Sequence, residues 1–515
     1  MTTCSDRTLG VVERLAQCAH CVRGWFGYEE DGYDIVRKTK IVATLGPALD
    51  DRAKLRAALE AGIDVVRLNF SHGEHDDHAR RVRDVRETAT GLERNIAVLA
   101  DLQGPKIRLG LLPDDGIELE NGSEVTLLPG VEELDDYTSE GQVALPVVYE
   151  ALGDDCEPGA MILIDDGSIR LVVSRASHDE VVARVVAGNV AKSRKGVNLP
   201  GVRVSAPSVT AKDREDLKVA VDLGCDWVAL SFVRKPEDLI EARELVGDHG
   251  GEAPLVAKLE RPEAIENLEA IVDASDAVMV ARGDLGVEIG AERVPAIQKE
   301  IIAEANRRNK PVVTATEMLD SMINSPRPTR AEASDIANAI FDGTDAVMLS
   351  GETAAGRYPV EAVRTMARIC EVAETSPQLV GDIEHEPAAA DDVGNTVARA
   401  AVTVARDVEA SALAVYSISG TSIQLVSKFR PPVRLVGLTP NDTARRRTAL
   451  MWGAEALLVP MKSESGDLIS AAERVLVDGG IARHGDRVVI VSGTAGSSGG
   501  TNRIYVHRIG DELQR

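Results

Sequence analysis

The sequence of 515 residues lacks any apolar run near the roughly 18 residues that a membrane-spanning helix requires. Its first 35 residues also lack the apolar core of a secretory signal. Basic side chains are few, 58 against 83 acidic ones, and the net charge of −25 excludes a general nucleic-acid binder and opposes adsorption to an anionic membrane. The charge therefore leads us to expect neither nucleic acid nor a membrane as a partner. Six cysteines are too few for a disulfide framework in a chain of this length, so we expect a cytoplasmic protein.

Residues 1–35 form an N-terminal extension with a possible metal motif. Cys18 and Cys21 are spaced like a pair of zinc ligands, and Cys4 could be a third. A structural zinc site needs four ligands, usually in two pairs, and the other three cysteines are scattered along the chain. We therefore favour a short amphipathic helix at residues 11–22 over a zinc site.

Eight short, β-branched apolar runs each end abruptly in polar or charged residues, and a helical stretch follows them. Such runs are typical of strands buried on both faces of a parallel sheet. Their starts are 22 to 35 residues apart, except for one interval of 130 residues. Eight strand–helix units predict a closed (β/α)8 TIM barrel. The runs begin at Lys40, Val65, Ile96, Asp226, Leu255, Ala277, Pro311 and Ala346.

The interval of 130 residues is too long for one crossover and predicts an inserted domain. Its Val-rich stretches, at 118–128, 160–174 and 179–190, are broken by Gly, Asp and Pro, which favours an antiparallel β-barrel. The insert leaves after the third strand, at the face where barrel enzymes have their sites, so we expect a lid. The predicted domains are the barrel at 36–107 and 207–378, the insert at 108–206, and a C-terminal α/β domain at 379–515.

The C-terminal domain follows an acidic stretch at 384–392 that is typical of a linker. A predicted helix at 393–408 precedes an apolar run that ends at Ser417. Further apolar runs lie at 434–438, 456–459 and 487–491. This pattern indicates an open α/β sheet.

Chemically capable side chains gather where the predicted barrel strands end, which a barrel built only for stability does not require. Alternate strand residues share a face, so Lys258 and Glu260 point the same way, as do Arg67, Asn69 and Ser71. The residues at these ends are Arg67, Asn69, Ser71, His72, Asp101, Lys106, Arg108, Lys258, Glu260, Arg282, Gly283, Asp284, Thr314, Thr316, Glu317, Ser350 and Glu352.

Two carboxylates on neighbouring strands, Glu260 and Asp284, suit Mg²⁺ (or Mn²⁺), because Mg²⁺ usually takes one or two carboxylates together with substrate oxygens. Arg67, Arg108 and Lys258 lie nearby, as cations do around phosphate. The alternative is a set of barrel-end salt bridges, but their placement on one rim favours a site.

Eight motifs in one order resemble the pyruvate kinase family, along about residues 36–515. Any one motif is weak evidence, but the eight together, with the insert in the family's usual place, are very specific. The motifs are Thr44-Leu45-Gly46-Pro47-Ala48, Arg67-Leu68-Asn69-Phe70-Ser71-His72-Gly73, Asp101-Leu102-Gln103-Gly104-Pro105-Lys106-Ile107-Arg108, Lys195-Gly196-Val197-Asn198-Leu199-Pro200-Gly201, Lys258-Leu259-Glu260, Ala281-Arg282-Gly283-Asp284-Leu285-Gly286, Ala315-Thr316-Glu317-Met318-Leu319 and Met348-Leu349-Ser350-Gly351-Glu352-Thr353.

The resemblance implies phosphoryl transfer between phosphoenolpyruvate and ADP, giving pyruvate and ATP, the final step of glycolysis. By the resemblance, Lys258 stabilises the transferring charge, and Glu260 and Asp284 hold the divalent ion. Arg67 binds the transferring phosphate, and Thr316 lies near the point where the enolate is protonated. The donor of that proton stays open. The substrate-binding residues that the resemblance implies are Arg67, Lys258, Gly283, Asp284 and Thr316.

The resemblance also implies a nucleotide site and a site for a monovalent cation. Most relatives have Glu where Lys106 stands, and those relatives hold K⁺ nearby. An ammonium group matches K⁺ in charge and approximate size, so we expect this enzyme not to require K⁺. Lys195, at the end of the insert, supports a lid that closes on the nucleotide. The implied nucleotide-binding residues are Asn69, Phe70, Ser71, His72, Arg108 and Lys195, and the equivalents of the monovalent-cation site are Asn69, Ser71, Asp101 and Leu102.

The sequence departs from the family pattern at several positions. Glu317 stands where many relatives have Gln. In the C-terminal domain the hydroxyl-rich loop at 419–422 lacks Lys, and Gly479 replaces the Arg that binds a sugar bisphosphate in activated relatives. A monophosphate such as AMP, a sugar phosphate, or no effector at all stays possible. Family members are usually homotetramers, and we expect the same here.

Two other functions fit part of the pattern. Another Mg²⁺-dependent barrel enzyme acting on phosphoenolpyruvate or a keto acid would explain Glu260 and Asp284, but would not need Arg108, Lys195 or the insert. A metabolite sensor without activity predicts the loss of a chemical residue, yet Lys258, Glu260, Asp284 and Thr316 are all present.

Overall fold

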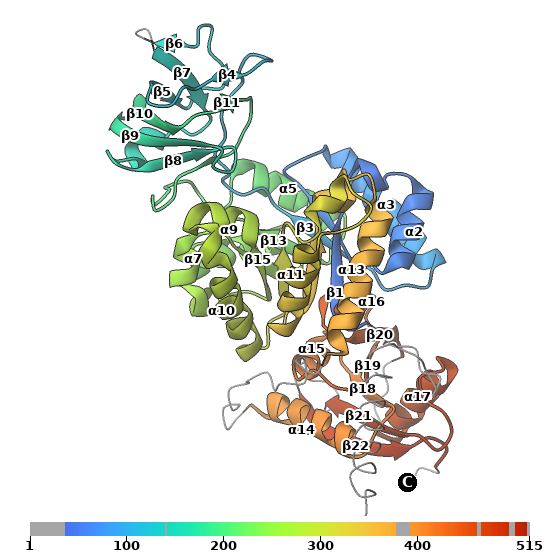
Figure 1. Ribbon diagram of the computed structural model, residues 1–515. Coiled ribbons are helices and arrows are strands. Elements are labelled where there is room, and N and C mark those ends of the chain that lie inside the picture. The colour runs from blue at the N-terminus through green and yellow to red at the C-terminus, as the bar shows by residue number, and fades with distance from the viewer. Residues whose placement is uncertain (1–36, 140–141, 377–391, 461–464, 494–499, 512–515) are drawn as a thin grey trace, which may run out of the picture.

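A computed structural model describes residues 37–139, 142–376, 392–460, 465–493 and 500–511. It shows a central barrel with a sheet domain at one end and an α/β domain at the other (Figure 1). The predicted linker at 384–392, apart from its last residue, and the N-terminal extension with Cys18 and Cys21 lie outside the described residues. None of the helices in the described ranges is both long and apolar enough to cross a bilayer.

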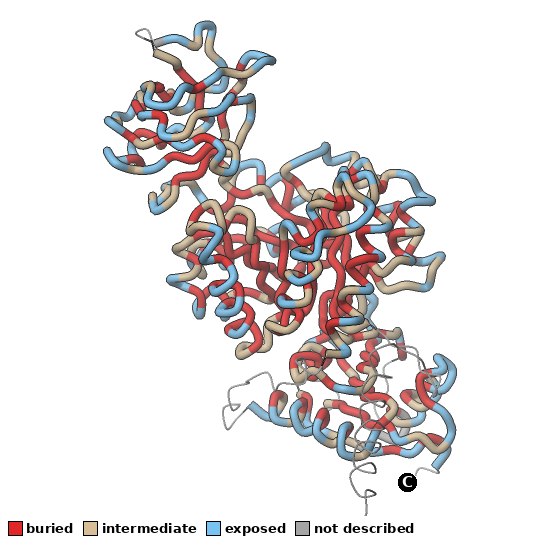
Figure 2. The backbone as a smooth tube through the Cα atoms, viewed as in Figure 1, coloured by how far each residue is buried: buried red, intermediate tan, exposed pale blue. Residues whose placement is uncertain are grey.

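All eight predicted runs form strands of one closed parallel barrel, which confirms the predicted fold. Each strand is almost wholly buried, as continuous apolar runs require (Figure 2). In sequence order the strands are β1 (Lys40–Thr44), β2 (Val65–Asn69), β3 (Ala97–Asp101), β13 (Trp227–Leu230), β14 (Leu255–Leu259), β15 (Ala277–Ala281), β16 (Val312–Ala315) and β17 (Ala346–Leu349).

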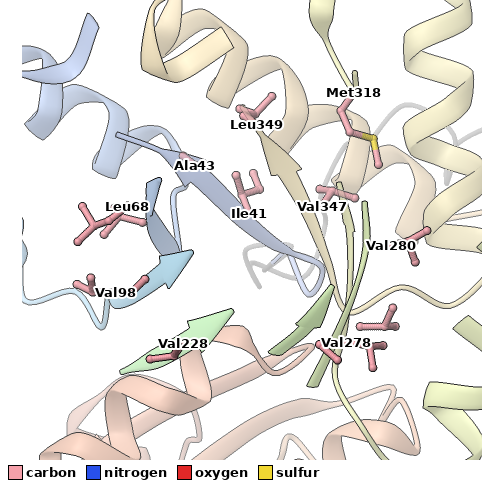
Figure 3. Close-up of a cluster of buried hydrophobic side chains, with 14 of the residues drawn as sticks. Ile41, Ala43, Leu68, Val98, Val228, Val278, Val280, Met318, Val347 and Leu349 are labelled. Carbon is pink, nitrogen blue, oxygen red and sulfur yellow. The ribbon is translucent and has the colours of Figure 1, made fainter. Parts of the chain in front are cut away.

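Helices surround the barrel and bury the outward side chains of the strands. Ile41, Val98 and Val278 are among those that pack in this outer layer (Figure 3). The helices are α2 (Arg52–Ala61), α3 (His75–Gly91), α5 (Ala211–Asp222), α6 (Pro236–Asp248), α7 (Pro262–Glu266), α8 (Leu268–Ala274), α9 (Arg282–Ile289), α10 (Val294–Arg307), α11 (Arg330–Phe341), α12 (Gly351–Ala354) and α13 (Pro359–Glu374), with short 3₁₀ turns η1 (Pro47–Leu49), η2 (Ala291–Arg293) and η3 (Asp320–Ile323).

The inward side chains fill the barrel as a second core, so the barrel is no pore. Val42, Leu99 and Met279 belong to this core. Ala449 and Leu450 of the C-terminal domain join the same cluster. The C-terminal domain therefore packs against the end of the barrel opposite the carboxyl ends of its strands.

The insert is a curled sheet whose strands follow the order β12-β8-β9-β10-β5-β7-β6. Its pairings are antiparallel except that β5 and β7 run parallel, so the prediction of a wholly antiparallel insert was wrong at this pair. The chain between them returns to the starting end of β5 before β7 begins. The elements are β4 (Ile117–Glu118), β5 (Glu124–Pro129), β6 (Thr138–Ser139), β7 (Gln142–Val147), α4 (Leu152–Asp155), β8 (Met161–Ile164), β9 (Ile169–Ser177), β10 (Glu180–Ala187), β11 (Val190–Ala191) and β12 (Val197–Asn198).

Two arginines at the barrel rim hold the arm by which the chain returns from the insert. Arg234 donates to the carbonyl oxygens of Val204, at 2.6 Å, and Ala206, at 3.0 Å. Arg261 donates to the carbonyl oxygen of Val202 at 2.9 Å. These three acceptors are backbone atoms, and Arg234 also donates to the Ser208 hydroxyl at 2.8 Å, so the arginines fix the path of the arm mainly through its backbone.

The C-terminal domain is the predicted open α/β sheet, with the order β20-β19-β18-β21-β22. Its last strand is antiparallel to β21 and was not predicted from the sequence. The elements are α14 (Val393–Asp407), β18 (Ala412–Tyr416), α15 (Thr421–Lys428), β19 (Arg434–Thr439), α16 (Asp442–Arg447), η5 (Thr448–Leu450), β20 (Ala454–Leu458), α17 (Ser465–Asp478), β21 (Arg487–Gly493) and β22 (Thr501–Arg508).

A buried ion pair joins this domain to the barrel. Asp345, just before β17, lies 2.6 Å from Nζ of Lys428, and both side chains are only 1% exposed. Arg430 reaches the other carboxylate oxygen at 2.8 Å. Burial lowers the pKa of Lys428 to about 8 despite the opposing charge of Asp345. This carboxylate therefore pairs with two cations of the C-terminal domain at the domain interface.

Asp345→Ala is expected to lower stability by about 3 to 5 kcal/mol, because it leaves Lys428 buried without its partner. Arg434→Ala is the matched control. It breaks the Arg434–Glu455 ion pair, which is more exposed and lies within the C-terminal domain, so its loss should cost about 1 kcal/mol or less. Denaturant unfolding of both variants measures the difference. Equal midpoints for the two variants would contradict the proposed role of Asp345.

Candidate functional site

The structure brings the predicted strand-end residues to one rim of the barrel, on the side of the insert. Arg67 comes from β2, Asp101 from β3 and Lys258 from β14. Asp284 lies in the first turn of α9, and Thr316 follows β16. The carboxyl ends of parallel strands meet at one face, which is why distant sequence segments converge here.

A buried chain of charges forms the centre of this site. Arg67 Nε donates to Asp101 Oδ2 at 2.6 Å. The other oxygen of Asp101 lies 3.2 Å from Lys258 Nζ, which is also 2.9 Å from Glu260 Oε1. The contact between Lys258 and Glu260 confirms that they point the same way.

Burial and charge act in opposite directions on these groups. For Lys258, burial favours the neutral amine, but Asp101 and Glu260 outweigh it and raise the pKa of the ammonium above its ordinary value. For Asp101, burial favours the neutral acid, but Arg67 and Lys258 prevail and lower the pKa of the carboxyl. Lys258 is therefore a fixed, desolvated positive charge at the rim.

Glu260 is a carboxylate with unused capacity for a ligand. Its Oε2 accepts a hydrogen bond from the Phe232 N–H at 2.8 Å, and its buried Oε1 is paired with Lys258 Nζ at 2.9 Å and accepts no hydrogen bond from any other described residue. Burial, and then the nearby charge of Asp284, raise the pKa of Glu260, while Lys258 opposes them. Two close carboxylates suit a divalent cation that prefers hard oxygen ligands.

Helix α9 begins at Arg282, and a strained turn faces its first residues. Thr316 has φ of 70° and Glu317 has φ of 55°, in the left-handed region that a β-branched residue seldom adopts. Arg282 holds the turn by donating to the Thr316 carbonyl at 2.7 Å. The Gly283 N–H donates to Thr316 Oγ1 at 2.8 Å. Such strain persists where surrounding contacts fix it, and it is common at active sites.

The loop after β2 carries four of the predicted nucleotide-binding residues. Asn69 Oδ1 accepts from the Ser71 N–H at 3.1 Å, which fixes the turn. His72 is exposed, whereas Phe70 is 2% exposed and its ring stacks on His78 with centroids 4.4 Å apart. A ligand at this loop can therefore meet Phe70 only through its backbone.

Positive charge surrounds this loop. Burial, and then the charges of Arg108, Arg67 and Lys106, lower the pKa of His72. The field of Lys106 therefore reaches the loop, although the nearest anionic partner of its ammonium is Asp284 Oδ1, at 3.1 Å. Lys106 thus contacts a predicted ligand of the divalent ion, and in the described part of the chain no ion pair joins its ammonium to Asp101 of the predicted monovalent-cation site.

Two predicted nucleotide-binding cations lie on the insert and its outgoing arm. Lys195 Nζ is 2.8 Å from Asp165 Oδ1, within the insert. Arg108 donates to the Arg194 carbonyl at 3.1 Å. The structure therefore places these two side chains on the insert and not in the buried charge network.

Sequence reasoning missed Ser231 and overvalued Glu352. Ser231, 1% exposed, accepts a hydrogen bond from Lys258 Nζ at 2.6 Å and donates to the Leu102 carbonyl at 2.7 Å. It directly follows β13, so the strand-end rule, applied to the fourth strand, would have found it. Glu352 is buried, and its oxygens accept from the N–H groups of Leu319 and Ser350, which makes it a structural residue.

The hydroxyl-rich loop of the C-terminal domain is only partly within the described ranges. Gly420, with φ of 93°, precedes α15. The Ser422 and Thr501 hydroxyls lie 2.5 Å apart. The Gly-rich segment at 494–499 lies outside the described residues, so the question of an effector stays open.

Comparisons with known proteins agree along most of the chain. The model of the family described as "Pyruvate kinase, barrel domain" matches residues 36–363, and that of "Pyruvate kinase, alpha/beta domain" matches residues 395–507. The pyruvate kinase of Geobacillus stearothermophilus is 44% identical over 488 residues, which are 93% of this chain and 81% of the relative. That of Mycobacterium tuberculosis strain H37Rv is 44% identical over 479 residues, which cover 93% and 100%. A crystal structure of a pyruvate kinase from Cryptosporidium parvum has a TM-score of 0.84 at 33% identity, covering 92% of this chain and 96% of the other.

Proposed function

The chain belongs to the pyruvate kinase family, a family of phosphotransferases, and we propose that the rim site described above is where it transfers a phosphoryl group from phosphoenolpyruvate to ADP. The observation that carries this assignment is the buried ammonium of Lys258, held between Asp101 and Glu260. ATP formation from phosphoenolpyruvate and ADP with Mg²⁺, measured across salt concentrations, tests it. An inactive protein would contradict it.

The site supplies charge where the reaction needs it. A transferring phosphoryl group spreads negative charge over its oxygens, so positioning and electrostatics dominate its transfer. Lys258 and Arg67 present fixed cations to that group. Because Asp101 already orients both side chains, they need not rearrange during the transfer. The Thr316 hydroxyl and the N–H groups at the start of α9 would hold the carboxylate end of the substrate.

We propose that Glu260 and Asp284 hold Mg²⁺ or Mn²⁺. Glu260 Oε1 has Lys258 as its partner and accepts no hydrogen bond from any other described residue, so it retains capacity for a metal ion beside the nearby Asp284. When bound, the ion would neutralise oxygens of the substrate and of the transferring group. Asp284 must then exchange its contact with Lys106 for the ion.

We propose that the insert closes as a rigid lid on the nucleotide, which Asn69–His72, Arg108 and Lys195 would bind. Two short arms join it to the barrel, and a pocket at their junction is lined by residues of both arms, including Ile107 and Val204. Closure would bring Lys195 from Asp165 to the nucleotide and exclude water. Small-angle scattering with and without Mg-nucleotide and substrate should show compaction. An unchanged profile would count against the lid.

We propose that the enzyme does not require K⁺, because Lys106 supplies a fixed positive charge in its place. The effect of Lys106 on the pKa of His72 supports this, since its charge acts at the loop that would hold the ion. Activity in tetramethylammonium buffer should equal that in K⁺ at matched ionic strength. Lys106→Glu should create a dependence on K⁺, whereas strong activation of the unmodified protein by K⁺ would reject the proposal.

Membership of the family also leads us to propose a homotetramer in the cytoplasm. Its substrates and products would be phosphoenolpyruvate, ADP, pyruvate and ATP. Sedimentation of the purified protein measures the oligomeric state directly.

A further inference from the structure

A lysine outside every predicted site supports the loop after β2. Lys212, in the first turn of α5, donates from Nζ to the carbonyl oxygen of Phe70 at 2.8 Å. The Phe70 N–H donates to the Asp101 carbonyl of the barrel. Within the turn, the His72 N–H donates to the Asn69 carbonyl and the Ser71 N–H to Asn69 Oδ1. Among the described residues, Lys212 alone donates a charge-assisted hydrogen bond to the Phe70 carbonyl from outside the loop.

The lysine is itself fixed by a buried carboxylate. Asp216 is 1% exposed, and its two oxygens lie 2.5 Å from Lys212 Nζ and 2.7 Å from His75 Nε2. His75 begins α3, the helix that follows the loop. A buried carboxylate needs such partners. Asp216 therefore connects α5 to both ends of the loop, through Lys212 at Phe70 and through His75 beyond Gly73.

The start of α5 also lies where both arms of the insert attach. Thr210 caps the helix in a capping box with Asp213. The second carboxylate oxygen of Asp213 accepts a hydrogen bond from the Gly104 N–H, in the outgoing arm, at 2.9 Å. The returning arm ends at Thr210. Lys212 therefore lies on a helix that contacts the outgoing arm and directly continues the returning arm of the insert.

We propose that Lys212 is a positioning residue that holds the loop of Asn69, Ser71 and His72 in the geometry that binds ADP. The inference rests on the proposed function, which assigns this loop to the nucleotide. Lys212 acts through the Phe70 carbonyl and does not touch the transferring group. β2 lies across the barrel from β15 in the closed strand order, so a displaced loop should affect ADP more than phosphoenolpyruvate.

Steady-state kinetics of Lys212→Met test this. The KM for ADP should rise about tenfold, as expected for the loss of a charge-assisted hydrogen bond, while the KM for phosphoenolpyruvate stays within about twofold. Lys212→Arg keeps a cationic donor and should restore much of the affinity for ADP. The matched control is Lys218→Met, which removes an exposed lysine of the same helix and should change neither constant. Thermal melting of each variant identifies any loss of folding.

Three outcomes would overturn this inference, and they show whether the proposed nucleotide site fails with it. A raised KM for ADP in Arg108→Met, with an unchanged KM in Lys212→Met, overturns the role of Lys212 alone. Unchanged values in both variants overturn the inference together with the proposed nucleotide site. Equal rises of both KM values in Lys212→Met, with no rescue by Lys212→Arg, show a merely structural residue and also overturn the inference.

Discussion

Lys258→Met is expected to reduce ATP formation from phosphoenolpyruvate and ADP by about 10³- to 10⁵-fold, the range for removing a cation that stabilises phosphoryl transfer. Its ammonium is buried and its pKa is raised, so the unmodified protein presents a full positive charge at this point. Methionine fills a similar volume without the charge. The loss should therefore appear in kcat, because the contact matters most in the transition state.

Controls separate chemistry from folding in this variant. Glu260 would lose its nearest cation, so the melting temperature is measured alongside activity. Lys218→Met, an exposed lysine on α5, should retain full activity. Activity of Lys258→Met within tenfold of the unmodified protein would remove Lys258 from the proposed chemistry.

Asp284→Asn and Glu260→Gln should each abolish most divalent-ion binding and lower turnover by several orders of magnitude, since each removes half of the proposed carboxylate pair. Titration with Mn²⁺, followed by electron paramagnetic resonance without substrate, measures binding independently of turnover. The reason is local: Glu260 Oε1 accepts no hydrogen bond from any described residue besides its ion-pair partner Lys258, and Asp284 is close enough to raise the pKa of Glu260.

Glu317→Gln is the matched control for these two variants. It removes a carboxylate from the same rim, in the strained turn after β16, without changing the proposed pair. Its Mn²⁺ titration should match that of the unmodified protein. Identical titrations for Asp284→Asn and the unmodified protein would refute a shared site.

Strand positions were predictable because every barrel strand is buried on both faces, which leaves continuous apolar runs such as Ile41-Val42-Ala43 in the sequence. The contact between Lys258 and Glu260 was equally predictable, because the two-residue period of a strand fixes which side chains share a face. These features depend on local geometry alone.

Other features depend on side-chain direction across long sequence separations. Lys106 reaches Asp284, 178 residues away, and no periodicity encodes that contact. The left-handed turn at Thr316 also has no sequence signal, since glycine is absent from it and Arg282 holds it by bonds to carbonyl oxygens. The parallel pairing of β5 with β7 depends on the path of the connecting chain.

The two arginines that hold the returning arm affect which positions of this sequence can tolerate substitution. Arg234 and Arg261 recognise carbonyl oxygens, which every amino acid supplies. Exposed positions of the arm, such as Arg203, can therefore change by mutation without loss of these bonds. The arginines themselves have no such freedom, because lysine lacks the planar fork that serves two acceptors at once. Variation among descendants of this gene should thus accumulate in the arm, while the two positions that hold it stay arginine.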